Sequence, residues 1–311
     1  MIVKKRFYDD RNVISTNYEY FHVVDFDKET IKKYEITSSY IYVGLHKLYR
    51  IRATRDIQNP YMIIHKGEVG GYIESEDNLD PYDESWIDKD VHLCENSKVK
   101  DLAYLTGNIT LFDNSIVCDK VTMFGKGEIQ LFGNTHIYQD ARLQNKDLES
   151  MKINNSSIFG DSDIYGSPFI FNSYIIDSCI QEKSKVLNSN IQDLADIEDD
   201  AYINNSNIFG SVVFGNAHII NTNIALGAFG GNASIKSKDD YLYISNFRNS
   251  PITFYKDVSG IICVSYCGYN GYLVKFKDTL KFKDEDERDR FDWMLDFVKS
   301  YFQIMSRSLV F

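Results

Sequence analysis

The sequence lacks a run of apolar residues long enough to cross a bilayer, and it contains few cysteines. Its first residues, Met1 to Arg6, are charged and have no apolar signal-peptide core. The five cysteines form an odd set without paired spacing, which favours reduced thiols over a disulfide framework. Three residues separate Cys263 from Cys267, but no cluster of histidines or cysteines completes a zinc site. These absences predict a soluble, cytoplasmic protein with no metal and no cofactor.

Charge is unevenly distributed along the chain. Residues 85–236 hold 11 basic and 19 acidic side chains, so this segment carries −8 of the formal net charge of −11. An outer surface of that sign repels the phosphates of DNA, RNA and anionic membranes. The sequence therefore argues against a nucleic-acid polymer or a membrane as the partner, and an anionic small ligand requires a local pocket.

Aliphatic residues recur at every sixth position after Ser85. A mostly small residue stands two positions before each of them. This pair of positions fits a coil of short strands in which both members point inward. Three such hexads, about 18 residues, make one turn of a three-sided solenoid, so the pattern predicts a left-handed parallel β-helix of hexapeptide repeats. The aliphatic positions are Ile87, Leu93, Val99, Leu105, Leu111, Val117, Met123 and Ile129.

The pattern continues with irregularities after Ile129. The register first moves by two residues, so that Leu131, Ile137 and Leu143 take the inward role, and a looser array with some five-residue steps follows. Asparagine-rich strings mark its shortened corners, where asparagine tolerates left-handed backbone geometry and its amide can pair along the solenoid. We expect one solenoid over 85–236, of about eight coils. The looser array consists of Ile158, Ile164, Ile170, Ile176, Val186, Ile191, Ile197, Ile203, Ile208, Val213, Ile219, Ile224 and Ile235.

Two different segments flank the predicted solenoid. Residues 1–84 contain strand patterns at Tyr40–Val43 and Leu48–Arg52 and can cap the open first coil. Residues 237–311 predict a small α+β region of strands followed by a helix with an acidic first turn. The strands are expected at Tyr241–Ser245, Ile252–Tyr255, Ile261–Ser265 and Gly271–Phe276, and the apolar stripe of the helix consists of Phe291, Met294, Leu295, Val298 and Phe302.

Specific motifs stand on both sides of the repeats. They read LYRIRA at 48–53, KGEVGGYIESEDNL at 66–79, WI at 86–87, ITFY at 252–255, ICVS at 262–265 and GYLVKF at 271–276. With these motifs the chain resembles the YdcK-type hexapeptide-repeat β-helix proteins, many of them encoded by bacteriophages and prophages. Where that family often has Cys-Gly-Cys-Phe, this chain reads YCGY at 266–269. Members of the family carry a transferase label that comes from the repeat, and fold analogy does not establish chemistry.

The first functional hypothesis is a non-catalytic binding protein. The resemblance connects the chain with phage proteins that sequester a host nucleotide immune signal, of the cyclic or ADP-ribose type. Basic residues beside the glycine-rich segment 67–71 can converge on phosphate oxygens, and two aromatic residues nearby can stack a base. In the alternative interpretation, Gly70 and Gly71 make the turn into the first coil and these basic residues are paired structurally. The candidate ligand-binding residues are Arg50, Arg52, Arg55, His65, Tyr72, Trp86 and Arg248.

Two further hypotheses stay open. Enzymes of the hexapeptide acyltransferase class use an outward histidine as general base, and His92, His136 and His218 each lie between two inward residues. His92 and His136 fall on different faces of the coil, and a solvent-facing or interface role is the alternative for all three. A structural, virion-associated spike is the third class. We expect a homotrimer, because such solenoids pack their flat faces around an axis, and Phe112, Phe124 and Phe132 suit that seam.

Overall fold

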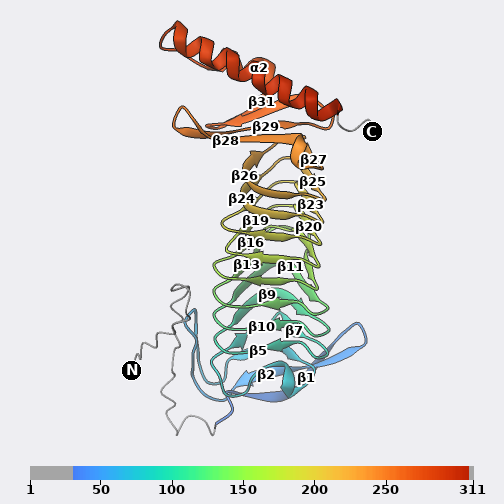
Figure 1. Cartoon of the computed structure of the whole chain (residues 1–311). Helices are drawn as coiled ribbons and strands as arrows, with labels where there is room; N and C mark the ends of the chain where they lie inside the picture. Colours follow the sequence, from blue (N-terminus) through green and yellow to red (C-terminus); the bar gives the residue numbers. More distant parts are fainter. Residues whose placement is uncertain (1–30, 308–311) are drawn as a thin grey trace, which may run out of the picture.

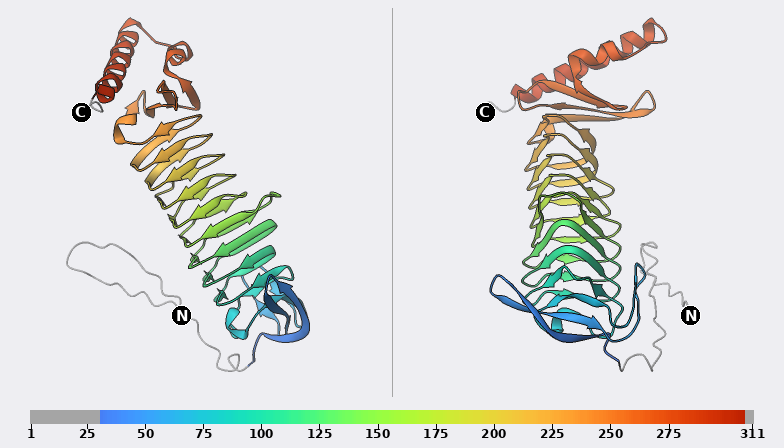
Figure 2. Two further views of the ribbon diagram at one scale, coloured as in Figure 1. Left: turned by 90° about the vertical axis from the view of Figure 1, so that its right-hand side faces the viewer. Right: turned by 180° about the vertical axis from the view of Figure 1, so that it is seen from behind.

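The main body of the protein is a left-handed parallel β-helix of about ten turns, as the sequence predicts (Figure 1). The computed structural model describes residues 31–307, so the charged start at 1–6 lies outside the described residues. The coils stack into one column, with an N-terminal cap at one end and a small sheet and a helix at the other (Figure 2).

Three walls of parallel strands enclose the axis, and each is defined by the side chains that it turns inward. Each inward residue pairs in register with its counterpart one turn further along the chain. The first wall turns in Ile87, Leu105, Met123, Leu143, Ile164, Ile180, Ile197, Val213 and Phe229. The second wall turns in Ile73, Leu93, Leu111, Leu131, Ile153, Ile170, Val186, Ile203, Ile219 and Ile235. The third wall turns in Leu79, Val99, Val117, Ile137, Ile158, Ile175, Ile191, Ile208 and Ile224.

Most wall strands are short because a corner follows each of them. The first wall contains β6 (Trp86–Ile87), β13 (Arg142–Asn145), β16 (Asp163–Tyr165), β19 (Cys179–Ile180) and β22 (Asp196–Ile197). The second contains β5 (Val69–Ile73), β7 (Val91–Leu93), β14 (Met151–Asn154), β17 (Phe169–Phe171), β20 (Lys185–Leu187), β23 (Tyr202–Asn204), β25 (His218–Ile220) and β27 (Ser234–Ile235). The third contains β8 (Lys98–Val99), β10 (Ile116–Val117), β12 (His136–Ile137), β15 (Ser157–Phe159), β18 (Tyr174–Ile176) and β21 (Asn190–Gln192). Longer strands that serve two walls are β9 (Tyr104–Leu111), β11 (Thr122–Phe132), β24 (Asn207–Val213) and β26 (Asn223–Phe229).

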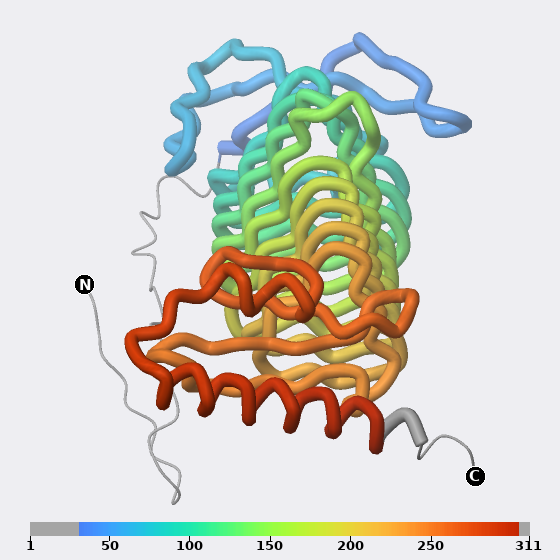
Figure 3. Tube along the Cα trace, turned by 90° about the horizontal axis from the view of Figure 1, so that it is seen from above, coloured from blue at the N-terminus to red at the C-terminus, as the bar shows by residue number. Residues whose placement is uncertain are grey.

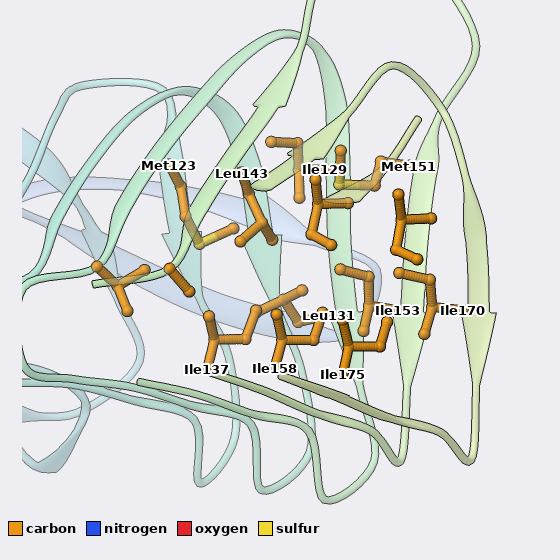
Figure 4. Close-up of a cluster of buried hydrophobic side chains, with 14 of the residues drawn as sticks. Met123, Ile129, Leu131, Ile137, Leu143, Met151, Ile153, Ile158, Ile170 and Ile175 are labelled. Atoms are coloured by element: carbon orange, nitrogen blue, oxygen red, sulfur yellow. The ribbon is translucent and has the colours of Figure 1, made fainter. Parts of the chain in front are cut away.

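The interior of the column is a continuous stack of aliphatic side chains, none of which has more than 1% of its surface exposed (Figure 4). The prediction that the repeat positions point inward is therefore confirmed, with one exception. Ile176 is half-exposed, and Ile175 takes the inward place beside Ile158. The sequence interpretation was wrong there because the step from Ile170 to the next wall is five residues, not six.

Parallel pairing starts before the predicted first coil. In β5, Tyr72 pairs with His92 and Ile73 with Leu93, and Leu79 bridges Val99. The walls therefore begin about one turn before Ser85, which accounts for part of the difference between about ten turns and the eight expected.

Serines at the corner between the second and third walls join successive turns. The hydroxyl of Ser173 accepts a hydrogen bond from the N–H of Ser189 (3.2 Å) and donates one to the carbonyl of Phe171 (2.8 Å). The Ser189 hydroxyl repeats this arrangement with the N–H of Ser206 (3.1 Å). The tight corner leaves room only for a small side chain, and the hydroxyl satisfies a backbone donor that is buried there.

Asparagines of the same corners adopt left-handed backbone geometry, as predicted. Asn172, Asn188 and Asn205 have φ angles of 47°, 49° and 49°. Their amides also pair along the column, because Asn172 Nδ2 donates to Asn188 Oδ1 (2.9 Å) and Asn205 Nδ2 donates to Asn221 Oδ1 (2.8 Å). The corners thus combine a backbone geometry that asparagine tolerates with an axial ladder of amides.

The N-terminal cap covers the open edge of the first coil. β1 (Tyr34–Val43) and β2 (His46–Ala53) form an antiparallel hairpin, and β2 pairs antiparallel with β5. A small hairpin of β3 (Ile57–Gln58) and β4 (Ile63–Ile64) follows. Seen along the axis, the β1–β2 hairpin projects beyond the walls (Figure 3). Because the edge strand is paired, the coil end is not free to stack on another sheet.

A four-stranded antiparallel sheet closes the other end. It consists of β28 (Tyr241–Phe247), β29 (Ser250–Lys256), β30 (Ile262–Tyr266) and β31 (Tyr269–Tyr272), followed by the helices α1 (Leu273–Phe276) and α2 (Glu285–Arg307). The predicted strand at Gly271–Phe276 is wrong in its second half, where the chain forms α1 and buries Leu273 and Phe276 beneath α2. The α2 stripe packs on the sheet as predicted. None of the helices in the described part combines the length and apolar character that crossing a membrane requires.

Replacing Ser189 with alanine tests the serine ladder. We expect the free energy of unfolding to fall by about 1–3 kcal/mol, because the buried N–H of Ser206 loses its acceptor. Chemical denaturation followed by circular dichroism measures this change. The control is Ser157→Ala in β15, a half-exposed wall serine whose loss should change stability little. Equal stability of the two variants would contradict the structural role of the ladder.

Candidate functional site

Three of the predicted site residues meet at the lower end of the second wall. The guanidinium of Arg50 lies 4.1 Å from the centre of the Tyr72 ring and donates a hydrogen bond to its hydroxyl (2.5 Å). Arg50 also donates to the carbonyl of Gly70 (3.3 Å). The ring of His92 lies beside Tyr72, with 5.7 Å between ring centres. These contacts fix the N-terminal cap to the first coils. They engage the guanidinium of Arg50, which the sequence analysis expected to bind the phosphate of a ligand.

The other basic residues of the cap are not brought to this cluster. Arg55 is paired with Glu84 at 3.3 Å and donates to the carbonyls of Tyr82 and Asp83. Arg52 lies 3.5 Å from Glu35, and the exposed His65 lies 3.9 Å from Asp56. The convergence on one phosphate that the sequence suggested is therefore absent from the described part of the chain.

Trp86, Gly70 and Gly71 pack inside the protein and do not face a ligand site. Trp86 has 1% of its surface exposed, so its ring is not accessible to a base. Gly70 and Gly71 lie inside β5 and do not form a turn; the turn is made by Gly67, whose φ is 92°. A Cβ on Gly70 would lie 2.7 Å from side-chain atoms of Trp86 and Ile51, so glycine is needed there for close packing.

Arg248 holds the hairpin of β28 and β29 to helix α2 and the segment before it. Its guanidinium lies 3.0 Å from Glu287 and donates to the carbonyl of Lys281 (3.1 Å). The guanidinium carbon also lies 5.0 Å from the centre of the Phe282 ring. These contacts give Arg248 partners within the chain in place of the anion that the sequence analysis expected.

The three wall histidines occupy separate places. His92 and His218 are on the second wall, seven turns apart, whereas His136 is on the third wall. Nδ1 of His92 lies 3.4 Å from the hydroxyl of Thr110, and Nε2 of His136 lies 3.4 Å from the sulfur of Cys118. Burial lowers the pKa of both His92 and His136 below the usual value for histidine. No two of these histidines can act on one substrate within one chain.

A hollow of about 250 Å³ lies on the first wall, away from the predicted residues. Phe124 pairs in register with Gln144, and Gln144 with Tyr165, so these three side chains form one outward column. Thr122 and Arg142 form the parallel column on the other side of the inward residues. Arg142 is the only arginine within residues 85–236. The sequence analysis missed the hollow, most of whose lining residues stand directly before or after the inward residues of successive turns. The hollow is lined by Tyr104, Thr106, Thr122, Met123, Phe124, Arg142, Leu143, Gln144 and Tyr165.

Arg142 supplies the positive charge of this hollow. Its Nε donates to Asp163 Oδ1 (2.7 Å) and its Nη2 to Asp163 Oδ2 (3.3 Å), and this hydrogen-bonded carboxylate raises the pKa of Arg142. The Arg142 side chain nevertheless has 57% of its surface exposed. Within residues 31–307, no hydrogen bond is formed by its Nη1, so the guanidinium presents a donor to the solvent beside two aromatic rings.

The next turns of the first wall are acidic. A second hollow of about 210 Å³ is lined by Asp161, Asp163, Asp177, Ser178, Cys179, Leu194, Ala195 and Asp196. One turn above Cys179, partial burial and then the adjacent Asp196 raise the pKa of Glu198 to about 7. The amide of Gln181 donates to Asp196 (3.1 Å) and Glu198 (3.4 Å). The wall therefore changes from a cationic to an acidic surface within a few turns.

The carboxyl pair predicts a pH-dependent stability. Because the pKa of Glu198 is raised in the folded state, its contribution is fully present below pH 4.5 and is lost as the pH rises through about 7. We expect the melting temperature of the protein, relative to that of Glu198→Gln, to fall across this window. Thermal melts between pH 4 and 8 measure the difference. The control Glu285→Gln changes an exposed residue of α2, and a pH-independent gap between wild type and Glu198→Gln would contradict the assignment.

Comparison with models of protein families finds no match to this chain, and comparison with curated proteins finds none either. The resemblance to the YdcK-type proteins, with the phage origin that it implies, therefore stays a prediction, and the functional argument depends on the geometry of the walls.

Proposed function

We propose that the protein is a non-catalytic binding protein for a small anionic nucleotide, and that the first-wall hollow is its binding site. The observation that carries the proposal is the exposed guanidinium of Arg142 beside the aromatic column of Phe124 and Tyr165. A guanidinium binds phosphate oxygens through several donors, and an aromatic ring stacks a base whatever its identity.

The spacing of the column suits a flat ring. Phe124 and Tyr165 are two turns apart, which is about 10 Å along the axis at the usual strand separation. Gln144 lies between them and offers both a donor and an acceptor to the edge of a base. The acidic turns above the hollow repel phosphate, so a bound nucleotide would direct its phosphate to Arg142 and away from Asp196.

The size of the hollow supports a binding site that a second copy completes. A volume of about 250 Å³ is at the lower end for a small-molecule pocket, and the hollow is open to the outside. We propose a homotrimer in which a wall of the neighbouring copy covers the first wall. Aromatic residues of the second wall are available for such a seam: the half-buried Phe112 and Phe132 stack with 5.1 Å between ring centres, and the exposed Phe169 and Phe171 follow on the same wall. Phe124 lies on the first wall, so the three phenylalanines that the sequence analysis assigned to one seam do not share a wall.

Sequestration of a host immune nucleotide in the cytoplasm is the specific form of this proposal. It requires binding without turnover, and the absence of His92, His136 and His218 from the lining of the first-wall hollow supports that choice over acyl transfer at this site. Acyl transfer by a single histidine is the competing hypothesis, and a virion-associated spike needs no ligand at all.

Equilibrium dialysis against cyclic and ADP-ribose-type nucleotides tests the binding site. We expect wild-type protein to retain one of these nucleotides and to release it unchanged on heating. Arg142→Ala should weaken binding about tenfold or more, because the phosphate loses a charged donor. The matched control is Arg52→Ala, which removes another exposed guanidinium that faces one carboxylate.

Three outcomes decide between the hypotheses. Recovery of a modified nucleotide, or turnover of acyl-CoA that depends on His92, His136 or His218, would contradict a non-catalytic role. Retention that Arg142→Ala and Arg52→Ala reduce equally would contradict the first-wall site. Sedimentation equilibrium tests the assembly, for which we expect a mass three times that of the 36.0 kDa chain.

A further inference from the structure

Three metal-ligating side chains lie together at the corner that follows the third wall, and a histidine of that wall contacts one of them. The sulfur of Cys118 and the nearest carboxylate oxygens of Asp101 and Asp119 all lie within 4.8 Å of one another. Nε2 of His136, one turn further along, lies 3.4 Å from the same sulfur. A thiol, an imidazole and two carboxylates are a donor set that zinc uses in proteins.

The fold fixes the two carboxylates before any metal binds. Asp101 and Asp119 occupy the same corner on successive turns, with φ angles of 67° and 57°. Oδ2 of Asp101 accepts a hydrogen bond from the N–H of Asp119 (3.2 Å), and Oδ2 of Asp119 accepts one from the N–H of Gln139 (2.9 Å). Each carboxylate therefore uses one oxygen to join two turns and keeps its other oxygen for a ligand.

Cys118 and His136 are held by the same stacking of turns. Cys118 follows the inward Val117 and therefore points out of the wall, although neighbouring side chains bury it. The His136 ring stacks on Tyr138, with 4.4 Å between ring centres, and this contact orients its Nε2 toward the sulfur. The other member of the pair, the Cys118 sulfur, lies within reach of this nitrogen, so the two donors face one another before any metal binds.

We propose that Cys118, His136, Asp101 and Asp119 form a zinc site that joins three successive turns of the β-helix. In a tetrahedral site with Zn–S of about 2.3 Å and Zn–N of about 2.0 Å, sulfur and nitrogen are about 3.5 Å apart. The observed separation of 3.4 Å matches this value, so the two inner ligands need little movement. The exposed carboxylates close the site with the oxygens that the corner hydrogen bonds leave free.

Binding must displace a positive charge and a proton. The ammonium of Lys100 lies 3.9 Å from Asp101 Oδ2, and about half of the Lys100 side chain is exposed, so it can turn toward the solvent. Burial and the two aspartates raise the pKa of the Cys118 thiol to about 12. The thiol proton leaves to the buffer when the metal–sulfur bond forms.

Cobalt titration of the reduced protein tests the site, because Co²⁺ replaces Zn²⁺ and reports its ligands by absorption. We expect one equivalent of Co²⁺ to give a thiolate-to-cobalt charge-transfer band that added Zn²⁺ removes. Cys118→Ser should abolish the band, and His136→Gln should weaken the visible bands of a tetrahedral ion. The matched controls, Cys267→Ser and His218→Gln, remove an exposed thiol and another wall histidine and should change neither spectrum.

A further variant keeps the proposal testable if Cys118→Ser fails to fold. Asp101→Asn with Asp119→Asn preserves the acceptors for the corner N–H groups but removes both charges. We expect this double variant to lower cobalt affinity at least tenfold. Absence of the charge-transfer band in the wild type, its survival in Cys118→Ser, or an unchanged affinity of the double variant would overturn the zinc site.

Discussion

The constraint on which the structure depends is axial registry: each turn must place its inward side chains directly over those of the turn before. Parallel strands can exchange backbone hydrogen bonds only in that register, and the interior has room for three large side chains per level. Turn length is free to vary only at the corners. Three turns of different length illustrate this: Val99 pairs with Val117, Leu131 with Ile153, and Ile203 with Ile219. All six side chains are buried despite the difference in turn length.

Registry also creates the outward columns in which chemistry can occur. Residues that are far apart in the sequence become direct neighbours, as Arg142 and Asp163 do on the first wall. Cys118 and His136 meet on the third wall in the same way. In a β-helix wall, successive turns can each contribute one residue to a site. The residues of such a site are dispersed in the sequence and form no local motif.

The interior could be predicted from the sequence because burial selects aliphatic residues at a fixed spacing. The prediction of an inward side chain was wrong at Ile176, where the spacing changes from six residues to five. The ion-pair partners of charged residues could not be predicted in this way. Arg55 and Arg248 look available for an anion in the sequence, but folding brings Glu84 and Glu287 to them from 29 and 39 residues away. The hollow beside Arg142 was missed because its residues come from four turns of unequal length, so their alignment depends on the corners.

The distribution of charge along the column determines where copies could meet without burying charge. The acidic and basic groups of both proposed sites lie in the turns below Asp200, whereas Ala201 to Ile235 contain no lysine, arginine, aspartate or glutamate. Bringing copies together along these last turns removes no charge from water, and desolvation of charge is the main cost of closing an interface. Asparagine ladders cover part of this stretch and satisfy one another within the chain. Contact between copies there would extend the seam proposed at the first wall without burying further charge, and the charged turns would supply the groups that select a ligand.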